Sequence, residues 1–168
     1  MTLLAALWGD QRGAAASEMA LVTPLLLILL MGSVELGNYF MNEHILVKAV
    51  RDGARFAARQ NFSNYDACSG APGGAVVADT QALVMTGLLS GGTNKLRNWT
   101  AATITVSVNC STTAGTETLE GIYRGRATGA PRVTVTASVP YQPVLASFGF
   151  SGIGLNLNAS QNAAVMGL

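Results

Sequence analysis

The residues of this chain that could carry chemistry are few and lie far apart in the sequence. The single histidine, His44, stands among Asn42, Glu43 and Lys48, with no candidate nucleophile beside it. Acid–base and nucleophilic catalysis need such groups within hydrogen-bonding reach of one another. The sequence also has no serine-nucleophile motif, no Gly-rich phosphate loop and no cluster with metal-ligand spacing. We therefore expect a protein that is not an enzyme and that needs no metal or cofactor.

The two cysteines, Cys68 and Cys110, are the next residues with chemical potential. They form no CxxC motif, and one histidine is too little to complete a zinc site with them. In an oxidising compartment we expect them to pair, which would stabilise the fold by roughly 3–4 kcal/mol if the bridge is unstrained. The alternative is that they are two buried free thiols.

A glutamate at the edge of a long apolar segment is the most informative single residue. The stretch RGAAASEMALVTPLLLILLMGSVELG covers residues 12–37, and Glu18 directly precedes its uncharged part. A carboxylate at the edge of the hydrocarbon region is costly unless it finds a partner. If the chain is cut after Gly13, the new amine of Ala14 lies one helical turn from Glu18 on the same face. Amine and carboxylate can then neutralise each other, within one chain or between neighbouring subunits.

The element that carries this glutamate is expected to be a helix that crosses a membrane. No charge occurs from Met19 to Val34, and the flank that reaches Met41 is again mostly apolar. As a helix, residues 14–41 would extend about 42 Å and the uncharged core about 24 Å, which is adequate for a span when the flanks are included. Pro24 should kink this helix. The alternative is a plain anchor that tolerates its proline.

The composition agrees with a membrane protein that is exported. Charged residues make up 11% of the 168 residues and apolar residues 49%, whereas soluble domains have roughly 25% charged residues. The formal net charge of +1 gives no basic field for nucleic acid. Lys48, Arg51 and Arg55 favour a cytoplasmic C-terminal side. The cysteine pair and the neutral, Thr- and Asn-rich C-terminal half favour export, and we expect export.

Beyond the span, the sequence predicts a helical stem that continues over residues 42–60. Its apolar residues recur at three- and four-residue spacing, which indicates one buried stripe. Gly53 within the stripe costs helix stability and indicates a close backbone contact. The members of the stripe are Leu46, Ala49, Val50, Gly53, Phe56 and Ala57.

The remainder predicts a small head with a second helix and an antiparallel sheet of about three strands, so the fold class is α+β. The second helix is expected over residues 75–89, ended by Gly91 and Gly92, with Val76, Thr80, Leu83, Val84 and Leu88 on one side. Residues 104–110, 133–139 and 155–160 alternate between apolar and polar side chains, which is typical of strands with one face in water. Their apolar faces, Leu155 included, should cover the stem and the second helix.

Four surface features are candidates for contact with a partner or with the membrane. Arg51, Arg55 and Arg59 fall on one helix face, which either contacts an acidic partner or lipid head groups, or is simply solvated. Glu35 either serves a neighbouring subunit or marks an interface. The polar loop over residues 111–131 is a candidate partner surface. The apolar segment from Tyr141 to Phe150 is a docking patch, a segment that rests on the membrane, or a loop over the core.

Taken together, the N-terminal motifs resemble the TadE family of minor pseudopilins, which act in the tight-adherence (Flp) type IV pilus assembly system. The resemblance covers about the first 60 residues, and beyond them only VTVTASVPYQPVL at 133–145 is loosely similar. The matching motifs are RGAAASE at 12–18, VTPLLLILL at 22–30, VELG at 34–37 and AVRDGARFAARQ at 49–60.

The resemblance implies a leader, residues 1–13, that a prepilin peptidase removes. Gly13 and Ala14 would flank the scissile bond, and Glu18 would be the assembly acid. The mature chain would have a transmembrane helix at 14–41, the stem at 42–60 and a periplasmic head at 61–168. This sequence departs from the pattern of the family in one respect: its leader has little positive charge.

The resemblance also implies where the chain works and with what. It would stay in the bacterial inner membrane or enter the pilus, and take part in pilus assembly or anchoring. Its partners would be the prepilin peptidase, other pilin or pseudopilin subunits, the inner-membrane pilus platform and the lipid bilayer. The alternative is an uncleaved single-span membrane protein whose exported head binds or regulates a partner.

Overall fold

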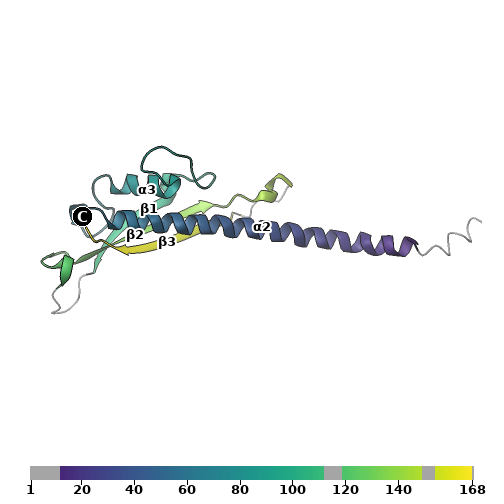
Figure 1. Cartoon of the computed structure of the whole chain (residues 1–168), viewed down its shortest axis with the longest axis horizontal. Coiled ribbons are helices and arrows are strands. Elements are labelled where there is room, and N and C mark those ends of the chain that lie inside the picture. The colour runs from purple at the N-terminus through teal and green to yellow at the C-terminus, as the bar shows by residue number, and fades with distance from the viewer. Residues whose placement is uncertain (1–11, 112–118, 149–153, 168) are drawn as a thin grey trace, which may run out of the picture.

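The chain folds into one long helix with a small α+β head along its C-terminal half (Figure 1). The computed structural model describes residues 12–111, 119–148 and 154–167, so most of the predicted leader lies outside the described residues. The helices are α2 (Arg12–Ala58) and α3 (Val76–Thr86), and the strands are β1 (Ile104–Ser111), β2 (Ala130–Pro140) and β3 (Asn156–Ala164). The predicted α+β fold, with its long N-terminal helix, second helix and three-stranded sheet, is confirmed.

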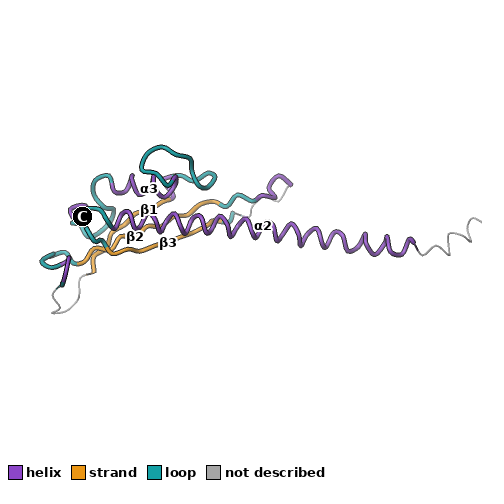
Figure 2. The backbone as a smooth tube through the Cα atoms, in the orientation of Figure 1, coloured by secondary structure: helices purple, strands orange, loops and turns teal. Residues whose placement is uncertain are grey.

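Helix α2 joins the predicted membrane span and the predicted stem in one helix of 47 residues. Its many Ala and Leu residues favour the helical state. Pro24 lies inside α2 without ending it. Near this proline the Thr23 hydroxyl donates a hydrogen bond of 2.6 Å to the carbonyl of Met19. Figure 2 shows the N-terminal half of α2 projecting beyond the strands and loops of the head.

The end of α2 lies close to its predicted position. The helix ends at Ala58, and the backbone N–H groups of Arg59 and Gln60 then bond to carbonyls three residues earlier, each at 3.1 Å. The buried Tyr65 hydroxyl donates a hydrogen bond to the carbonyl of Ala57. These bonds satisfy carbonyls of the last turn, which have no partners within the helix itself.

The three strands form an antiparallel sheet in the order β1-β2-β3. Val106 pairs with Val135 in the first ladder, and Val139 pairs with Leu157 in the second. The alternating burial that the sequence predicts is present in β1 and β2. The predicted alternation is wrong at Leu155, because this residue lies before β3 and is 53% exposed. The carbonyl of Leu155 accepts a hydrogen bond from the backbone of Tyr141 outside the strand, at 2.8 Å.

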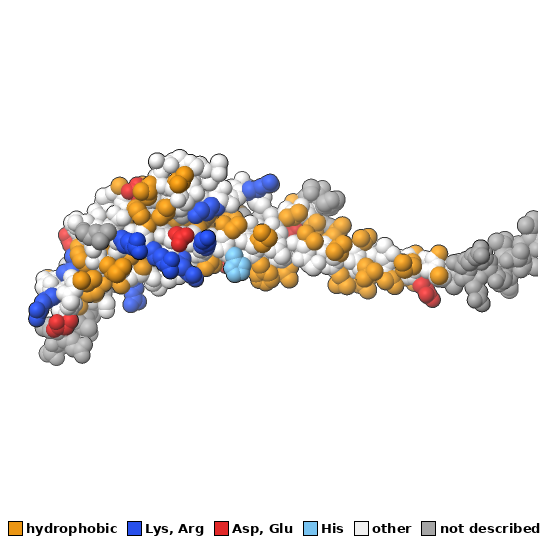
Figure 3. Space-filling model, in the orientation of Figure 1, with side chains coloured by type: hydrophobic (Ala, Val, Ile, Leu, Met, Phe, Trp, Pro, Cys, Tyr) orange, Lys and Arg blue, Asp and Glu red, His pale blue; other side chains and the backbone are white. Residues whose placement is uncertain are grey.

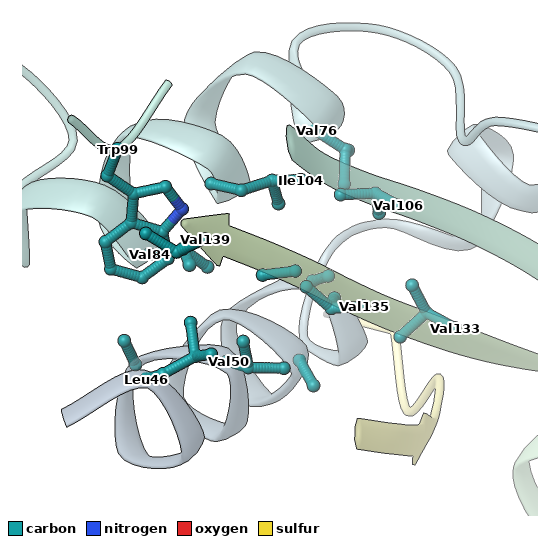
Figure 4. Packing of buried hydrophobic residues seen from close by; sticks show 14 of the residues in the cluster. Leu46, Val50, Val76, Val84, Trp99, Ile104, Val106, Val133, Val135 and Val139 are labelled. Carbon is teal, nitrogen blue, oxygen red and sulfur yellow. The ribbon is translucent and has the colours of Figure 1, made fainter. Parts of the chain in front are cut away.

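The core lies between the inner face of the sheet, α3 and the C-terminal half of α2, as the sequence predicts. Figure 4 shows valines of β2 pointing toward Leu46 and Val50 of α2, with Val84 of α3 and Trp99 closing one end. Val133 and Val135 are fully buried, as is Leu46. The predicted apolar stripe of the stem therefore faces the core, although Phe56 is only partly buried.

Helix α3 is shorter than the sequence predicts. It ends at Thr86, because Gly87 adopts a left-handed conformation with φ of 86° and its N–H bonds to the carbonyl of Leu83. This is an ordinary glycine C-cap. The predicted end at Gly91 and Gly92 is wrong. Leu88, which the sequence places on one side of this helix together with Val84, lies beyond its end and is 54% exposed.

Gly53 is the point of closest approach between α2 and α3, as its place in the stripe predicts. A Cβ added at Gly53 would lie 2.3 Å from Cγ2 of Val84, whose side chain is fully buried. That separation is far below van der Waals contact, so any larger residue must displace the Val84 side chain or move the two helices apart.

Replacing Gly53 by alanine should destabilise the protein, although alanine is the better helix former. Overpacking costs about 1–3 kcal/mol, which exceeds the gain of about 1 kcal/mol in helix propensity. Thermal unfolding of the full chain in detergent measures the result. Gly37→Ala is the matched control, because no atom lies within 4 Å of a Cβ added there. Val84→Ala should partly rescue Gly53→Ala. A Gly53→Ala protein as stable as the wild type would contradict the tight contact.

Candidate functional site

The predicted cleavage and assembly residues lie at the projecting end of α2. Gly13 is exposed, and a Cβ added there would meet no heavy atom within 4 Å. Glu18 is also exposed, and it forms no ion pair in the described part of the chain. Since α2 contains the whole segment, the backbone of Ala14 and the side chain of Glu18 stand one helical turn apart on the same face. No described part of the head covers them.

Between Glu18 and the head, α2 exposes its apolar side chains to all sides. Leu21, for example, is 80% exposed, and none of the residues in an 18-residue window with mean hydropathy of 2.1 is buried in the protein. Figure 3 shows these hydrophobic side chains along the narrow projecting part of the molecule. By length and composition, α2 is the one helix among the described residues that can cross a membrane. The chain is therefore consistent with a single-span membrane protein.

At the head end of the apolar run, Glu35 fastens α2 to the C-terminal part of the head. Its Oε1 accepts hydrogen bonds from the Tyr141 hydroxyl and, at 3.3 Å, from the backbone N–H of Val144. Its Oε2 accepts from the N–H of Leu145 at 3.0 Å. Val144 and Leu145 begin the 3-10 helix η4 (Val144–Phe148). Unpaired N–H groups at such an end attract a carboxylate.

Tyr141 completes this contact, which we call the junction and define as Glu35, Asn38, Tyr39, Tyr141 and η4. The amide of Asn38 donates to the Tyr141 hydroxyl at 2.8 Å, and the Tyr39 ring meets the Tyr141 ring edge-on, with 5.2 Å between centroids. Burial and the hydrogen bond to Glu35 raise the pKa of Tyr141 above its ordinary value. The phenol therefore stays protonated at neutral pH and can donate to Glu35.

The junction is the arrangement that the sequence analysis did not find. From the sequence, Glu35 either serves a neighbouring subunit or marks an interface, and the structure gives it partners within its own chain. The only signal in the sequence that points to this contact is the position of Glu35 directly after the uncharged run that ends at Val34. Its partners lie more than a hundred residues away, so no local pattern connects them. Phe150, the predicted end of the Tyr141 segment, lies outside the described residues.

Replacing Glu35 by alanine should release η4 from α2. The change removes the acceptor of the Leu145 N–H, and hydrogen bonds to charged groups are worth about 1.5–3 kcal/mol. Hydrogen exchange of the full chain in detergent should therefore become faster at Leu145 by roughly tenfold or more. Glu35→Gln keeps one acceptor oxygen and should give a smaller increase. Unchanged exchange at Leu145 in Glu35→Ala would show that the carboxylate does not hold this segment.

A cavity of about 580 Å³ lies beside the junction. Its walls come from four separate segments: the α2 turn with Asn38 and Asn42, the loop with Lys95 and Arg97, the end of β2 with the residues that follow it, and Leu157 of β3. No carboxylate is among the described residues that line it. The cavity can therefore accept an anionic group.

The predicted arginine row lies on the exposed side of the stem. Arg51, Arg55 and Arg59 are all exposed, and none forms an ion pair with any described residue. Figure 3 shows basic side chains gathered along this part of the molecule. The single histidine, His44, is exposed as well. A partner for the arginine row remains a prediction.

Cys68 and Cys110 are joined by a disulfide, with 5.1 Å between their Cα atoms. The bridge ties the segment after α2 to the end of β1, where the N–H of Val108 also bonds to the carbonyl of Gly70 at 2.8 Å. No group of three metal-binding side chains occurs within the described residues.

Three contacts of Arg126 and Tyr123 hold the described part of the predicted surface loop 111–131 on the head. Arg126 forms an ion pair of 3.0 Å with Asp66, and its guanidinium lies 4.7 Å from the ring centroid of Phe62. The Tyr123 hydroxyl donates to the carbonyl of Val165 at 2.8 Å. Residues 112–118 of the loop lie outside the described residues. Partner binding by this loop stays a prediction.

Residues 13–55 match the protein-family model described as TadE-like protein. The matched segment begins at the predicted scissile bond, contains the exposed apolar half of α2 and ends within the part of α2 that packs on the head. It agrees with the family that the N-terminal motifs resemble. Searches of curated proteins and of solved structures gave no significant match.

Proposed function

We propose that this chain, whose N-terminal helix matches the TadE-like family over residues 13–55, is a minor pilin-like subunit of a tight-adherence pilus. The match supports a Tad pilus-associated protein. The finer role that we propose is assembly or anchoring of the pilus from the bacterial inner membrane. The observation that carries the proposal is that the matched segment contains a stretch of helix that is apolar and has no buried residue before it enters the head.

In this proposal a prepilin peptidase cuts the chain between Gly13 and Ala14. The chain is then a substrate and not itself a catalyst. The cut creates a cationic amine one helical turn from Glu18, and each of these two groups lowers the cost of placing the other at the edge of the hydrocarbon region. The exposure of Gly13 and Glu18 supports this sequence of events, because neither group is used by the described part of the head.

The proposed assembly step is the side-by-side packing of projecting helices. Ala15, Ala16 and Ser17 are exposed and small, so neighbouring helices can approach closely at this level. The amine of one subunit can then pair with Glu18 of the next. The head lies along the other half of α2 and leaves this half free for such contacts (Figure 1). Other pilin or pseudopilin subunits and the pilus platform are the proposed partners.

The proposed location of the head is the periplasm. The Cys68–Cys110 disulfide supports it, since such bonds persist in oxidising compartments. The basic residues after the span, Lys48, Arg51 and Arg55, would by themselves favour the opposite orientation. We give the disulfide more weight, because a dedicated export pathway can overcome a modest charge bias.

The N-terminal residue of the mature protein tests the proposal. The full chain is extracted from membranes of cells with an active prepilin peptidase and analysed by mass spectrometry. We expect it to begin at Ala14. Gly13→Leu should leave it uncut, and Gly32→Leu, a matched change in the same helix, should not affect processing. A wild-type chain that still begins at Met1 would contradict processing and favour an uncleaved single-span protein with an exported binding head.

A further inference from the structure

We infer that the cavity beside the junction binds the phosphate of an anionic phospholipid in the leaflet where α2 leaves the membrane. The inference deepens the proposed function and rests on its membrane span. The site consists of Lys95 and Arg97, from the loop, and of Asn38 and Asn42, from α2. Nothing in the family match points to this site, because Lys95 and Arg97 lie outside the matched residues.

The depth of the cavity places it at the lipid head groups. The charge-free part of α2 ends at Val34, and its exposed apolar face continues to Phe40 and Met41, which are 53% and 68% exposed. The membrane surface therefore crosses α2 between Val34 and Met41. Asn38 lies between these two positions, and Asn42 lies about 6 Å further along the helix. The head-group region is itself about 5–8 Å thick on each side.

The side chains of the cavity suit a phosphate diester. Lys95 and Arg97 are exposed and form no ion pair with any described residue. Arginine and lysine both bind phosphate oxygens, arginine with two parallel hydrogen bonds. The side-chain amides of Asn38 and Asn42 are already engaged in part, by the Tyr141 hydroxyl and by the carbonyl of Asn38. The two cations therefore supply most of the proposed attraction.

The basic wall is held in place by the core beneath it. The backbone N–H of Lys95 bonds to the carbonyl of Met85 at 2.8 Å, and the Asn94 amide bonds to the carbonyl of Trp99 at 2.8 Å. Leu96, between the two cations, is buried, as is Trp99. The loop is thus anchored before any ligand arrives, which reduces the entropy lost on binding.

The third wall favours a lipid over a soluble phosphate. It includes Val144, which is 50% exposed at the start of η4. Glu35 binds this segment against the end of the apolar run of α2. An exposed apolar side chain beside two cations matches a phospholipid, which offers hydrocarbon next to phosphate. A soluble phosphate would gain nothing from Val144.

Lipid retention by the full chain tests the inference. The protein is reconstituted into nanodiscs of phosphatidylcholine with a minor fraction of phosphatidylglycerol, and the lipids that stay bound after gentle detergent extraction are counted by native mass spectrometry. We expect phosphatidylglycerol to be enriched on the wild type. The enrichment should fall on the order of tenfold in Lys95→Gln/Arg97→Gln, because each cation near an anionic surface contributes severalfold to binding. The single change Arg97→Gln should give part of the loss.

The matched control is Arg124→Gln/Arg132→Gln, which removes the same charge from exposed residues at the other end of β2. It should keep the enrichment. Equal loss in both double variants, or no loss in Lys95→Gln/Arg97→Gln, would overturn the site. Competition by soluble glycerol phosphate at matched concentration would show a phosphate site without lipid preference and would also overturn it. Thermal unfolding checks that each variant is folded.

The test separates this inference from the proposed function. Carbonate extraction of vesicles made of phosphatidylcholine alone reports whether α2 spans the membrane. If the wild type is not integrated there, the proposed span fails, and the lipid site fails with it. If the wild type is integrated but shows no enrichment that depends on Lys95 and Arg97, only the lipid site is wrong.

Discussion

Glu18→Ala is expected to leave the protein in the membrane but to reduce the number of assembled pili by at least roughly tenfold. The change keeps the apolar run of α2 and removes the one carboxylate that can neutralise the new amine of Ala14. A tenfold effect corresponds to only about 1.4 kcal/mol at a subunit contact. Removing one partner of a poorly hydrated ion pair costs more than that, at about 3–5 kcal/mol. Pili on the cell surface are counted by electron microscopy.

The control for Glu18→Ala is Glu120→Ala, which removes an exposed carboxylate from the head. It should leave pilus number unchanged. Glu18→Asp keeps the charge but shortens the reach, and should give an intermediate number. Mature protein levels in the membrane must be equal in all strains. Normal pilus numbers with Glu18→Ala would remove the proposed assembly role of this residue.

Loss of the Cys68–Cys110 bridge is expected to have the largest effect on the stability of the head. A disulfide that closes a loop of 42 residues restricts the unfolded chain and contributes about 4 kcal/mol in the chain-entropy model. The double variant Cys68→Ser/Cys110→Ser should therefore unfold at a clearly lower temperature. The full chain in detergent is unfolded by heat and followed by circular dichroism. Native stabilities are usually only about 5–15 kcal/mol, so this loss is a large fraction.

The disulfide prediction has an internal control. Wild-type protein in reducing agent should fall to the stability of the double variant, and the variant itself should not respond to the reducing agent. Reduced and unreduced wild type should also differ in mobility on gels. If both thiols of the purified protein can be alkylated after denaturation without reduction, the bridge is absent and the prediction is wrong.

The sequence determined those features that depend on short spacings along the chain. The uncharged run from Met19 to Val34 makes α2 a membrane-span candidate wherever the rest of the chain lies. The alternation in β1 and β2 predicts their buried faces, because successive side chains of a strand point to opposite sides. The sequence also showed the small residues after Gly13 and the position of Glu18, because both depend only on neighbouring residues. The motifs behind the family resemblance are local in the same sense. The motifs that carried the resemblance lie mainly within the matched residues 13–55.

Sequence reasoning failed where the end of an element depends on one backbone conformation. Gly87, not Gly91 and Gly92, ends α3, because Gly87 comes first along the chain, adopts a left-handed conformation and donates its N–H to the carbonyl of Leu83. Leu155 has the residue type that the alternating pattern requires. However, β3 begins at Asn156, and the side chain of Leu155 stays outside the core. Several glycines or apolar residues in a row offer equivalent choices, and packing selects among them.

Only the tertiary structure decided what lies at the membrane end of the head. Glu35 contacts Tyr141 and Leu145, and the cavity beside them is lined by four separate segments, which bring Asn38 close to Lys95. Side chains brought together from distant parts of the chain leave no periodic signal, because periodicity reports which side of an element is buried and not what it packs against. The sequence by itself thus determined a span, an acid at its start and an α+β head. The fold determined how that head is fastened to the span.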